Sequence, residues 1–271
     1  MKKLIIGILC GIWLGTLSVG AQCAAKNDAI QPGERLTYEL KFNWKFIWVK
    51  AGEAKMNLEP VTYEGKNCYK TTLLAVSNSK VDFFFKMRDT ITCITTDRLE
   101  PVYFRKGAEE GSRYTVDEAW FKFQDGKSIV NQQRWRKDRE TVYATDTLEQ
   151  CVFDMLSILL QARSFDPTSY KKGDKIHFPM ATGRKVEDQT LIYRGKKNFK
   201  AENDVKYRCL VFSLVEYNKK GKEKEVITFY VTDDKNHLPV RLDLFLNFGS
   251  AKAFLETVEG NRHPMTSIIE D

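Results

Sequence analysis

The strongest constraint on the fold is a two-residue alternation near the start of the chain. Every second residue of this stretch is apolar and large: Leu36, Tyr38, Leu40, Phe42, Trp44, Phe46 and Trp48. Successive side chains of a β-strand point to opposite faces, so this period predicts a strand with one apolar face. At about 3.3 Å per residue the strand would extend roughly 40 Å. Such a face requires a core or a ligand to cover it.

Further extended segments follow, with turn residues between them. They include residues 68–76, 90–95, 114–123, 128–136, 207–217 and 238–248. Asp125-Gly126 favours a tight hairpin, because glycine adopts a positive φ without strain. Together these segments predict a mainly β fold, with one large antiparallel sheet that is curved or closed into a barrel.

One segment has helical spacing instead. Asp146 and Glu149 are placed as a capping box, in which each side chain satisfies a free amide of the first helical turn. Apolar residues then recur at helical spacing up to Arg163, and Pro167 prevents any continuation. The sequence therefore predicts a single helix over about residues 147–163, packed on the concave face of the sheet.

The N-terminus has the features of a secretory signal peptide. Lys2 and Lys3 precede an apolar run over residues 4–19, and small residues follow at Gly20 and Ala21. The run is shorter than the ~20 apolar residues that a transmembrane helix needs. We therefore expect residues 1–21 to be cleaved and residues 22–271 to form a single β-rich domain without a transmembrane span. This mature protein would be periplasmic or outer-membrane-associated.

Charge and motifs narrow the range of functions. The chain carries 43 Lys and Arg against 36 Asp and Glu, and no basic stripe joins aromatic platforms, so we expect no nucleic-acid partner. The histidines are far apart in sequence, and adjacent carboxylates such as Asp117-Glu118 face opposite sides of a strand. Phosphate-binding glycine loops, nucleophile elbows and metalloprotease helices are missing from the sequence. We predict no catalytic residue, metal site or cofactor, and we favour a protein that is not an enzyme.

Five cysteines would remain after cleavage, an odd number that cannot pair completely: Cys23, Cys68, Cys93, Cys151 and Cys209. An oxidising compartment permits one bridge, and Cys68 with Cys93 is the preferred pair because both lie in neighbouring extended segments. The alternative, which we favour, is that all of them are buried thiols that act as small hydrophobic residues.

Two aromatic groups are the candidate ligand-binding residues: Trp44, Phe46 and Trp48, and then Phe83, Phe84 and Phe85. The first group could line a cavity, although such residues more often fill the core of a sheet. The second group follows a turn at Asn78-Ser79. A strand buried on both faces is the more common explanation of such a run, and a loop tip that contacts lipid or acts as a lid is the other.

Several short motifs recur in a characteristic order. They are residues 33–38 (GERLTY), 51–54 (AGEA), Pro101 with Phe104, 110–111 (EG), 154–157 (DMLS) with Arg163, 232–234 (TDD), 238–240 (LPV) and 249–253 (GSAKA). Their order and spacing resemble an exported bacterial family known as domain of unknown function 3108, over nearly all of residues 22–271. The resemblance implies a periplasmic or surface-associated sheet protein of Gram-negative bacteria, with no established activity and no accepted catalytic residues.

Three functions are compatible with these observations. The one we favour is an envelope protein that binds an apolar or amphipathic ligand, such as a lipid, without catalysis, because the chain combines an aromatic wall with export. The second is a structural or interaction protein that docks another envelope protein or a surface glycan. The third is a hydrolase of envelope glycans or peptides, whose carboxylates only the fold would bring together.

Overall fold

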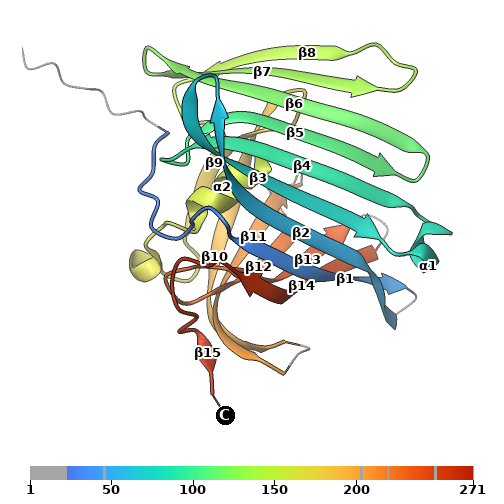
Figure 1. Ribbon diagram of the computed structural model, residues 1–271, viewed down its shortest axis with the longest axis vertical. Coiled ribbons are helices and arrows are strands. Elements are labelled where there is room, and N and C mark those ends of the chain that lie inside the picture. The colour runs from blue at the N-terminus through green and yellow to red at the C-terminus, as the bar shows by residue number, and fades with distance from the viewer. Residues whose placement is uncertain (1–22, 45–46, 202–203, 219, 247–248, 271) are drawn as a thin grey trace, which may run out of the picture.

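A computed structural model describes residues 23–44, 47–201, 204–218, 220–246 and 249–270 (Figure 1). The predicted signal peptide, residues 1–21, lies outside this part of the chain. The strands are β1 (Arg35–Trp44), β2 (Ile47–Tyr63), β3 (Lys66–Ser77), β4 (Met87–Thr96), β5 (Pro101–Glu110), β6 (Arg113–Gln124), β7 (Lys127–Arg136), β8 (Val142–Leu148), β9 (Lys175–Ala181), β10 (Val186–Lys200), β11 (Lys206–Tyr217), β12 (Glu223–Thr232), β13 (Pro239–Leu246), β14 (Gly249–Glu259) and β15 (Ile268–Ile269).

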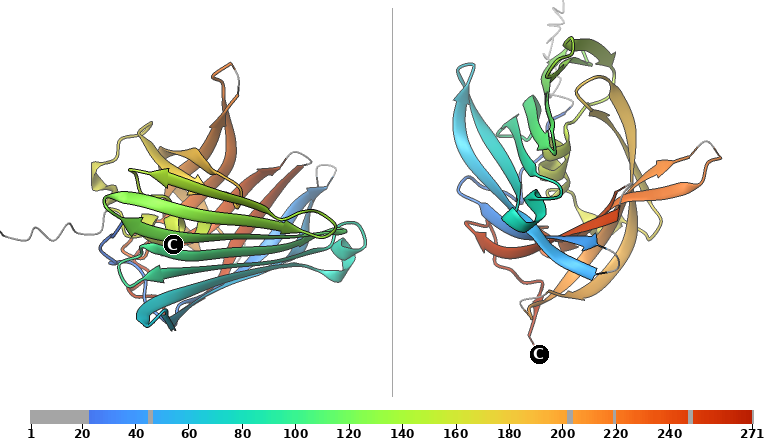
Figure 2. Two further views of the ribbon diagram at one scale, coloured as in Figure 1. Left: turned by 90° about the horizontal axis from the view of Figure 1, so that it is seen from above. Right: turned by 90° about the vertical axis from the view of Figure 1, so that its right-hand side faces the viewer.

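All of these strands belong to one antiparallel sheet, as predicted. The strand order runs from β8 back to β1, continues from β14 back to β9, and adds β15 beside β11. The sheet curls around a helix into an open, barrel-like shape (Figure 2). Side chains of β7 reach the β9–β10 connection, which lies near the opposite edge of the sheet. The amide of Gly183 donates to Gln132 Oε1 at 2.9 Å, and Arg134 Nη2 donates to the Thr182 carbonyl at 2.8 Å.

The helix occupies only part of its predicted range. The helical segments are α1 (Ser79–Asp82), α2 (Met155–Ala162) and a 3-10 turn, η1 (Pro167–Ser169). Asp146 is not a helix cap but a residue of β8, where pairing with β7 satisfies the backbone. The N-cap of α2 is Asp154, which accepts from the amides of Leu156 at 2.8 Å and Ser157 at 2.9 Å. Ser157 Oγ accepts from the Asp154 amide in return and completes the capping box.

The predicted single strand over residues 36–48 is a hairpin. β1 ends at Trp44 and β2 begins at Ile47, with Asn43 paired to Trp48. Because directly opposite residues share a face, Trp48 lies on the face opposite to that of Phe42. The apolar wall is therefore confined to β1, and the chain reverses before it could extend further.

Gly52 lies at a β-bulge. Leu40 pairs with Gly52 while Lys41 pairs with Lys50, which leaves Ala51 as the extra residue. A Cβ on Gly52 would lie 2.0 Å from the Val76 carbonyl oxygen of β3. Glycine is required here because two backbones approach closely.

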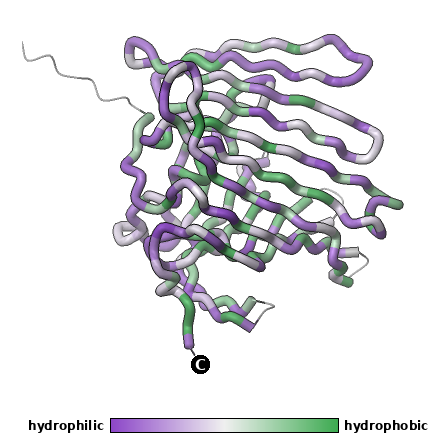
Figure 3. The backbone as a smooth tube through the Cα atoms, in the orientation of Figure 1, coloured by the Kyte–Doolittle hydropathy of each residue, from purple (hydrophilic) through white to green (hydrophobic). Residues whose placement is uncertain are grey.

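The core lies between α2 and the face of the sheet that it contacts, which we call the inner face. Leu156 and Leu160 of α2 are buried in a cluster with Cys93, Phe104 and Ala119. A second cluster gathers residues of β1, β2, β11, β13 and β14, among them Leu36, Tyr38, Met56, Val240 and Leu255. Hydrophobic and hydrophilic residues alternate along many of the strands (Figure 3).

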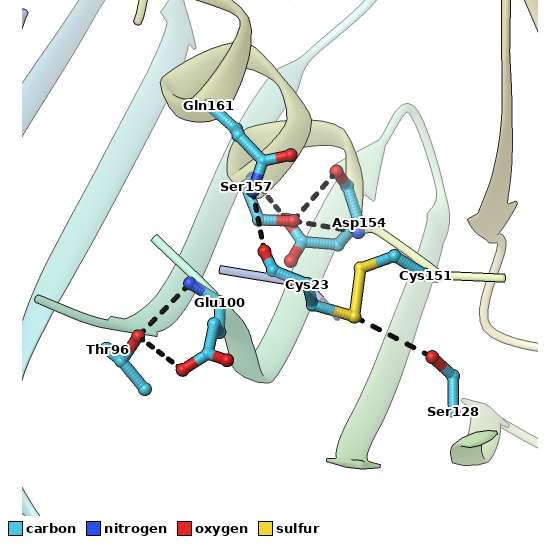
Figure 4. The surroundings of a disulfide bond; sticks show 8 residues. All are labelled: Cys23, Thr96, Glu100, Ser128, Cys151, Asp154, Ser157 and Gln161. Atoms are coloured by element: carbon cyan, nitrogen blue, oxygen red, sulfur yellow. Dashed lines mark hydrogen bonds between the residues drawn. A yellow bond between two sulfur atoms is a disulfide. The ribbon is translucent and has the colours of Figure 1, made fainter. Parts of the chain in front are cut away.

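A disulfide ties the N-terminal segment to the chain just before α2 (Figure 4). It joins Cys23 to Cys151, which are 128 positions apart in sequence. Gln161 Nε2 of α2 donates to the Cys23 carbonyl at 2.9 Å. The N-terminal segment and α2 are therefore fixed to each other.

Neither prediction for the cysteines included this bridge. The first paired Cys68 with Cys93, and the second left all five cysteines as thiols. Cys68, Cys93 and Cys209 are buried free thiols. Cys93 pairs with Thr71, which is three residues from Cys68, so the Cys68 and Cys93 side chains point to opposite faces of the sheet. A disulfide between neighbouring strands also requires a register that places both cysteine side chains on the same face.

A buried ion pair fixes the other end of α2. Arg163, the C-cap residue, donates from Nη1 to Glu34 Oε1 at 2.5 Å and from Nη2 to Glu34 Oε2 at 2.8 Å. Its Nε donates to the Asn236 carbonyl at 3.0 Å, and both charged side chains are only 1% exposed. The pair links α2 to the segment before β1 and to the turn between β12 and β13. We call this part of the molecule the closed end.

Candidate ligand-binding site

A continuous apolar row crosses the inner face away from α2. Successive pairings connect one residue from each of eight neighbouring strands. We call these residues the inner row: Val49, Phe42, Ala251, Leu244, Ile227, Leu214, Leu191 and Ile176. Directly opposite residues share a face, so the eight side chains point to the same side of the sheet.

The inner row is only partly buried. Val49 is 37% exposed, and the other seven residues are of intermediate burial. The outer face beside it is mixed: Asp243 and Thr228, next to Leu244 and Ile227, are polar, while Ile192 and Val215, next to Leu191 and Leu214, are apolar and buried. A contiguous apolar stripe that stays in contact with solvent is typical of an interaction or ligand-binding surface.

The inner row ends at neighbouring strand connections that also expose large apolar side chains. We call this second group the rim: Ile47 (67% exposed), Trp48 (37%), Phe83 (85%), Phe84 (71%), Phe85 (39%), Phe245 (40%) and Leu246 (39%). The end of β1 and the start of β14 are neighbours because Phe42 pairs with Ala251, and α1 lies beside the start of β2. These strand ends and α1 lie on the right of Figure 1, at what we call the open end.

Local hydrogen bonds hold α1 and its phenylalanines in place. Asn78, the N-cap, accepts from the amides of Lys80 and Val81 at 3.1 and 3.0 Å. Its amide group donates to the Lys50 carbonyl of β2 at 2.7 Å. At the end of α1, Asp82 pairs with Arg88, and the guanidinium holds the pKa of that carboxyl below its usual range. The exposed phenylalanines therefore stand on an ordered turn.

The structure brings the two predicted aromatic groups to the same end of the sheet. Phe83, Phe84 and Phe85 form an exposed tip after α1, so the strand buried on both faces was the wrong alternative. Trp48 lies at the start of β2 with Lys252 Nζ 4.0 Å from its ring centroid. Trp44 closes β1, while its side chain, like the whole of Phe46, lies outside the described residues.

The part of the inner face that β4 to β7 form carries charged residues. Asp89, Lys106, Asp117 and Arg134 all point to this face, with Arg134 in an ion pair with Asp117. Lys106 Nζ lies 3.7 Å from Asp89 Oδ2, and Asp89 Oδ1 has no hydrogen-bond partner among the described residues. Burial raises the pKa of Asp89 to about 6. The inner face is thus amphipathic, a property that the separate strands did not predict.

A shallow cavity of about 430 Å³ lies on the outer face over β10 to β13. Its charged lining is largely paired. Arg194 bonds Glu225 at 3.3 Å, Lys196 bonds Asp233 at 2.8 Å, and Arg241 bonds Asp243 at 2.7 Å. These contacts account for most of the charged lining as surface ion pairs, and the apolar inner row and rim remain the candidate site.

Comparisons with known proteins agree with the fold. The model of a protein family of unknown function, DUF3108, matches residues 37–256. Among curated proteins, none matches this sequence. A β-barrel-like protein of domain of unknown function DUF1849 from Brucella abortus superposes with a TM-score of 0.56 at 10% identity, covering 85% of this chain and 99% of that one. A Bacteroides fragilis protein with a YmcC-like fold gives a TM-score of 0.35 at 8% identity, over 88% and 100% of the two chains. The first likeness shows a shared fold alone, and the second carries no argument.

Proposed function

We propose that this chain, which belongs to the DUF3108 family, is an exported envelope protein that binds an apolar or amphipathic ligand, such as a lipid, without catalysis. The ligand would lie along the inner row, and the rim would border its entrance. Phe83, Phe84 and Phe85 are the rim residues that we expect to contact it, with Trp44 and Phe46 as further candidates from the β1–β2 hairpin. Trp48 points to the outer face, so we expect it to flank the entrance rather than to line the inner row.

The observation that carries this proposal is the inner row. Eight apolar side chains in continuous register remain partly exposed, although α2 covers the neighbouring part of the same face. Burial of apolar surface is favourable by about 25 cal/mol per Å², so an apolar chain placed along this row would be stabilised. The charged groups of β4 to β7 on the same face support an amphipathic ligand rather than a purely apolar one.

The proposed location rests on two features. The predicted signal peptide would direct residues 22–271 out of the cytoplasm. The Cys23–Cys151 disulfide supports an oxidising compartment, because such bridges are rare in the cytosol. Both fit the periplasm or the periplasmic side of the outer membrane.

Dye binding tests the proposal. Purified residues 22–271 are titrated with N-phenyl-1-naphthylamine, whose fluorescence rises in apolar surroundings, and the dye is then displaced with palmitate. We expect Leu244→Asn to weaken dye binding about tenfold, since it removes roughly 1.4 kcal/mol or more of apolar contact. Leu74→Asn is the matched control, because Leu74 is 41% exposed and, next to Leu73, lies on the outer face.

Equal dye affinity in the wild type and the Leu244→Asn variant would contradict the proposal. Native mass spectrometry of the protein purified from an envelope gives an independent readout, with a retained lipid as the expected result. A mass without ligand, together with crosslinking to one stoichiometric protein partner, would instead favour the interaction protein.

A further inference from the structure

The rim combines exposed apolar side chains with positive charge. The sequence around its three connections, residues 41–50, 78–88 and 244–252, contains seven Lys and Arg and a single acidic residue, Asp82. Asp82 is already paired with Arg88 at 2.5 Å. Basic residues therefore outnumber acidic ones in these three segments.

The basic groups surround the apolar tips. Lys80 is exposed on α1. The Lys50 and Lys86 side chains are 60% and 44% exposed and form surface ion pairs with Glu39 at 2.6 Å and Glu109 at 2.8 Å. Lys252 lies over the ring of Trp48. Exposed phenylalanines beside tryptophan and lysine residues are expected where a protein contacts a bilayer, since Trp and Lys favour the headgroup region and Phe the acyl region.

We propose that the rim docks on the surface of an anionic phospholipid bilayer, with Phe83 and Phe84 entering the acyl region. The inference deepens the proposed function and rests on it, because docking would place the open end of the inner row against the source of its lipid. Basic residues near an anionic membrane and buried apolar side chains both favour such docking.

The alternative partner for this surface, another protein, would have to match it with acidic groups around an apolar recess. A bilayer needs no such complementary shape, and the exposed tips come from three separate connections that lie side by side. Among the described residues, no helix is long and apolar enough to span a bilayer. The contact that we propose is therefore peripheral, through the rim.

Vesicle co-sedimentation tests the docking. Residues 22–271 are mixed with vesicles of phosphatidylcholine alone, or with vesicles in which phosphatidylglycerol replaces a third of that lipid. We expect binding to the anionic vesicles that weakens at about 1 M salt, where the Debye length is about 3 Å. Phe83→Ser with Phe84→Ser should reduce partitioning at least about tenfold, and Lys80→Glu about fivefold or more.

Two controls keep the outcomes distinct. Lys235→Glu changes an exposed lysine in the β12–β13 turn, at the closed end, and should leave vesicle binding unchanged. Wild-type protein that ignores anionic vesicles, or that binds them equally after both phenylalanines are replaced, overturns the docking. If dye uptake in vesicle-free buffer persists in that case, the proposed function survives; if vesicles are bound but Leu244→Asn takes up dye normally, the inner-row site fails alone.

Discussion

The closed and open ends of the sheet differ in whether their apolar surface is covered. At the closed end, α2, the N-terminal segment, a disulfide and a buried ion pair cover the inner face. At the open end the same face continues as the inner row and ends in exposed tips. This difference indicates that stability is concentrated at one end, which leaves the other free for binding. Each prediction below tests that division.

The largest expected effect comes from breaking the buried ion pair. Arg163→Met would leave the Glu34 carboxylate buried without its guanidinium, and we expect a loss of about 3–5 kcal/mol in the free energy of unfolding. Urea denaturation of the purified protein measures it. Arg194→Met, which breaks the half-exposed pair with Glu223, is the control and should cost about 0–1 kcal/mol. Similar losses in the two variants would refute the special role of the closed end.

Removal of the disulfide should come next. Cys23→Ala with Cys151→Ala opens a link between residues 128 positions apart, and we expect a loss of about 2–4 kcal/mol. The midpoint of guanidinium unfolding reports it, with Cys209→Ala as a control that removes a buried free thiol. In the denatured but unreduced wild type, residues 22–271 should react with thiol reagents only at Cys68, Cys93 and Cys209. Labelling of Cys23 would show that the bridge does not form.

The sequence predicted the sheet better than the parts that close it. Alternation along β1 and β13 depends only on neighbouring residues, so the antiparallel, curved sheet could be predicted. The helix was placed too early because Asp146 and Glu149 match a capping box as well as Asp154 and Ser157 do. Only pairing with β7 decides that the first pair belongs to a strand. Tertiary contacts overrode a local signal.

The candidate site was predicted in part for the same reason. The phenylalanines of residues 83–85 were visible as an unusual run, but their exposure depends on α1 and its cap, Asn78. The inner row was not predicted, because each of its members is one ordinary apolar residue in a different strand. The row emerges only from the register of eight strands, which no local pattern specifies. The Cys23–Cys151 bridge was missed for a similar reason.

A smaller effect is expected from pH, on the charged side of the inner face. Burial raises the pKa of Asp89 from 3.8 to about 6, so the folded protein binds this proton more tightly than the unfolded chain does. Stability should therefore fall as the pH rises from about 4 to about 6, and Asp89→Asn should remove about 1–2 kcal/mol of that decline. Thermal unfolding across this range measures it. Asp154, whose pKa burial also raises to about 6, should keep the remaining slope. An unchanged slope in Asp89→Asn would show that Asp89 does not titrate in this range.

The smallest effect on stability should come from the rim. Its size tests the difference between the two ends most directly. Phe83 and Phe84 are 85% and 71% exposed, so their replacement by serine removes little buried surface. We expect Phe83→Ser with Phe84→Ser to change the free energy of unfolding by no more than about 0.5 kcal/mol, as for other exposed positions. Large apolar groups that contribute nothing to the fold are retained at a cost in solubility, which supports a role in binding. A loss above about 1.5 kcal/mol in urea would mean that these rings pack within the fold, and the open end would then be part of the stabilising structure.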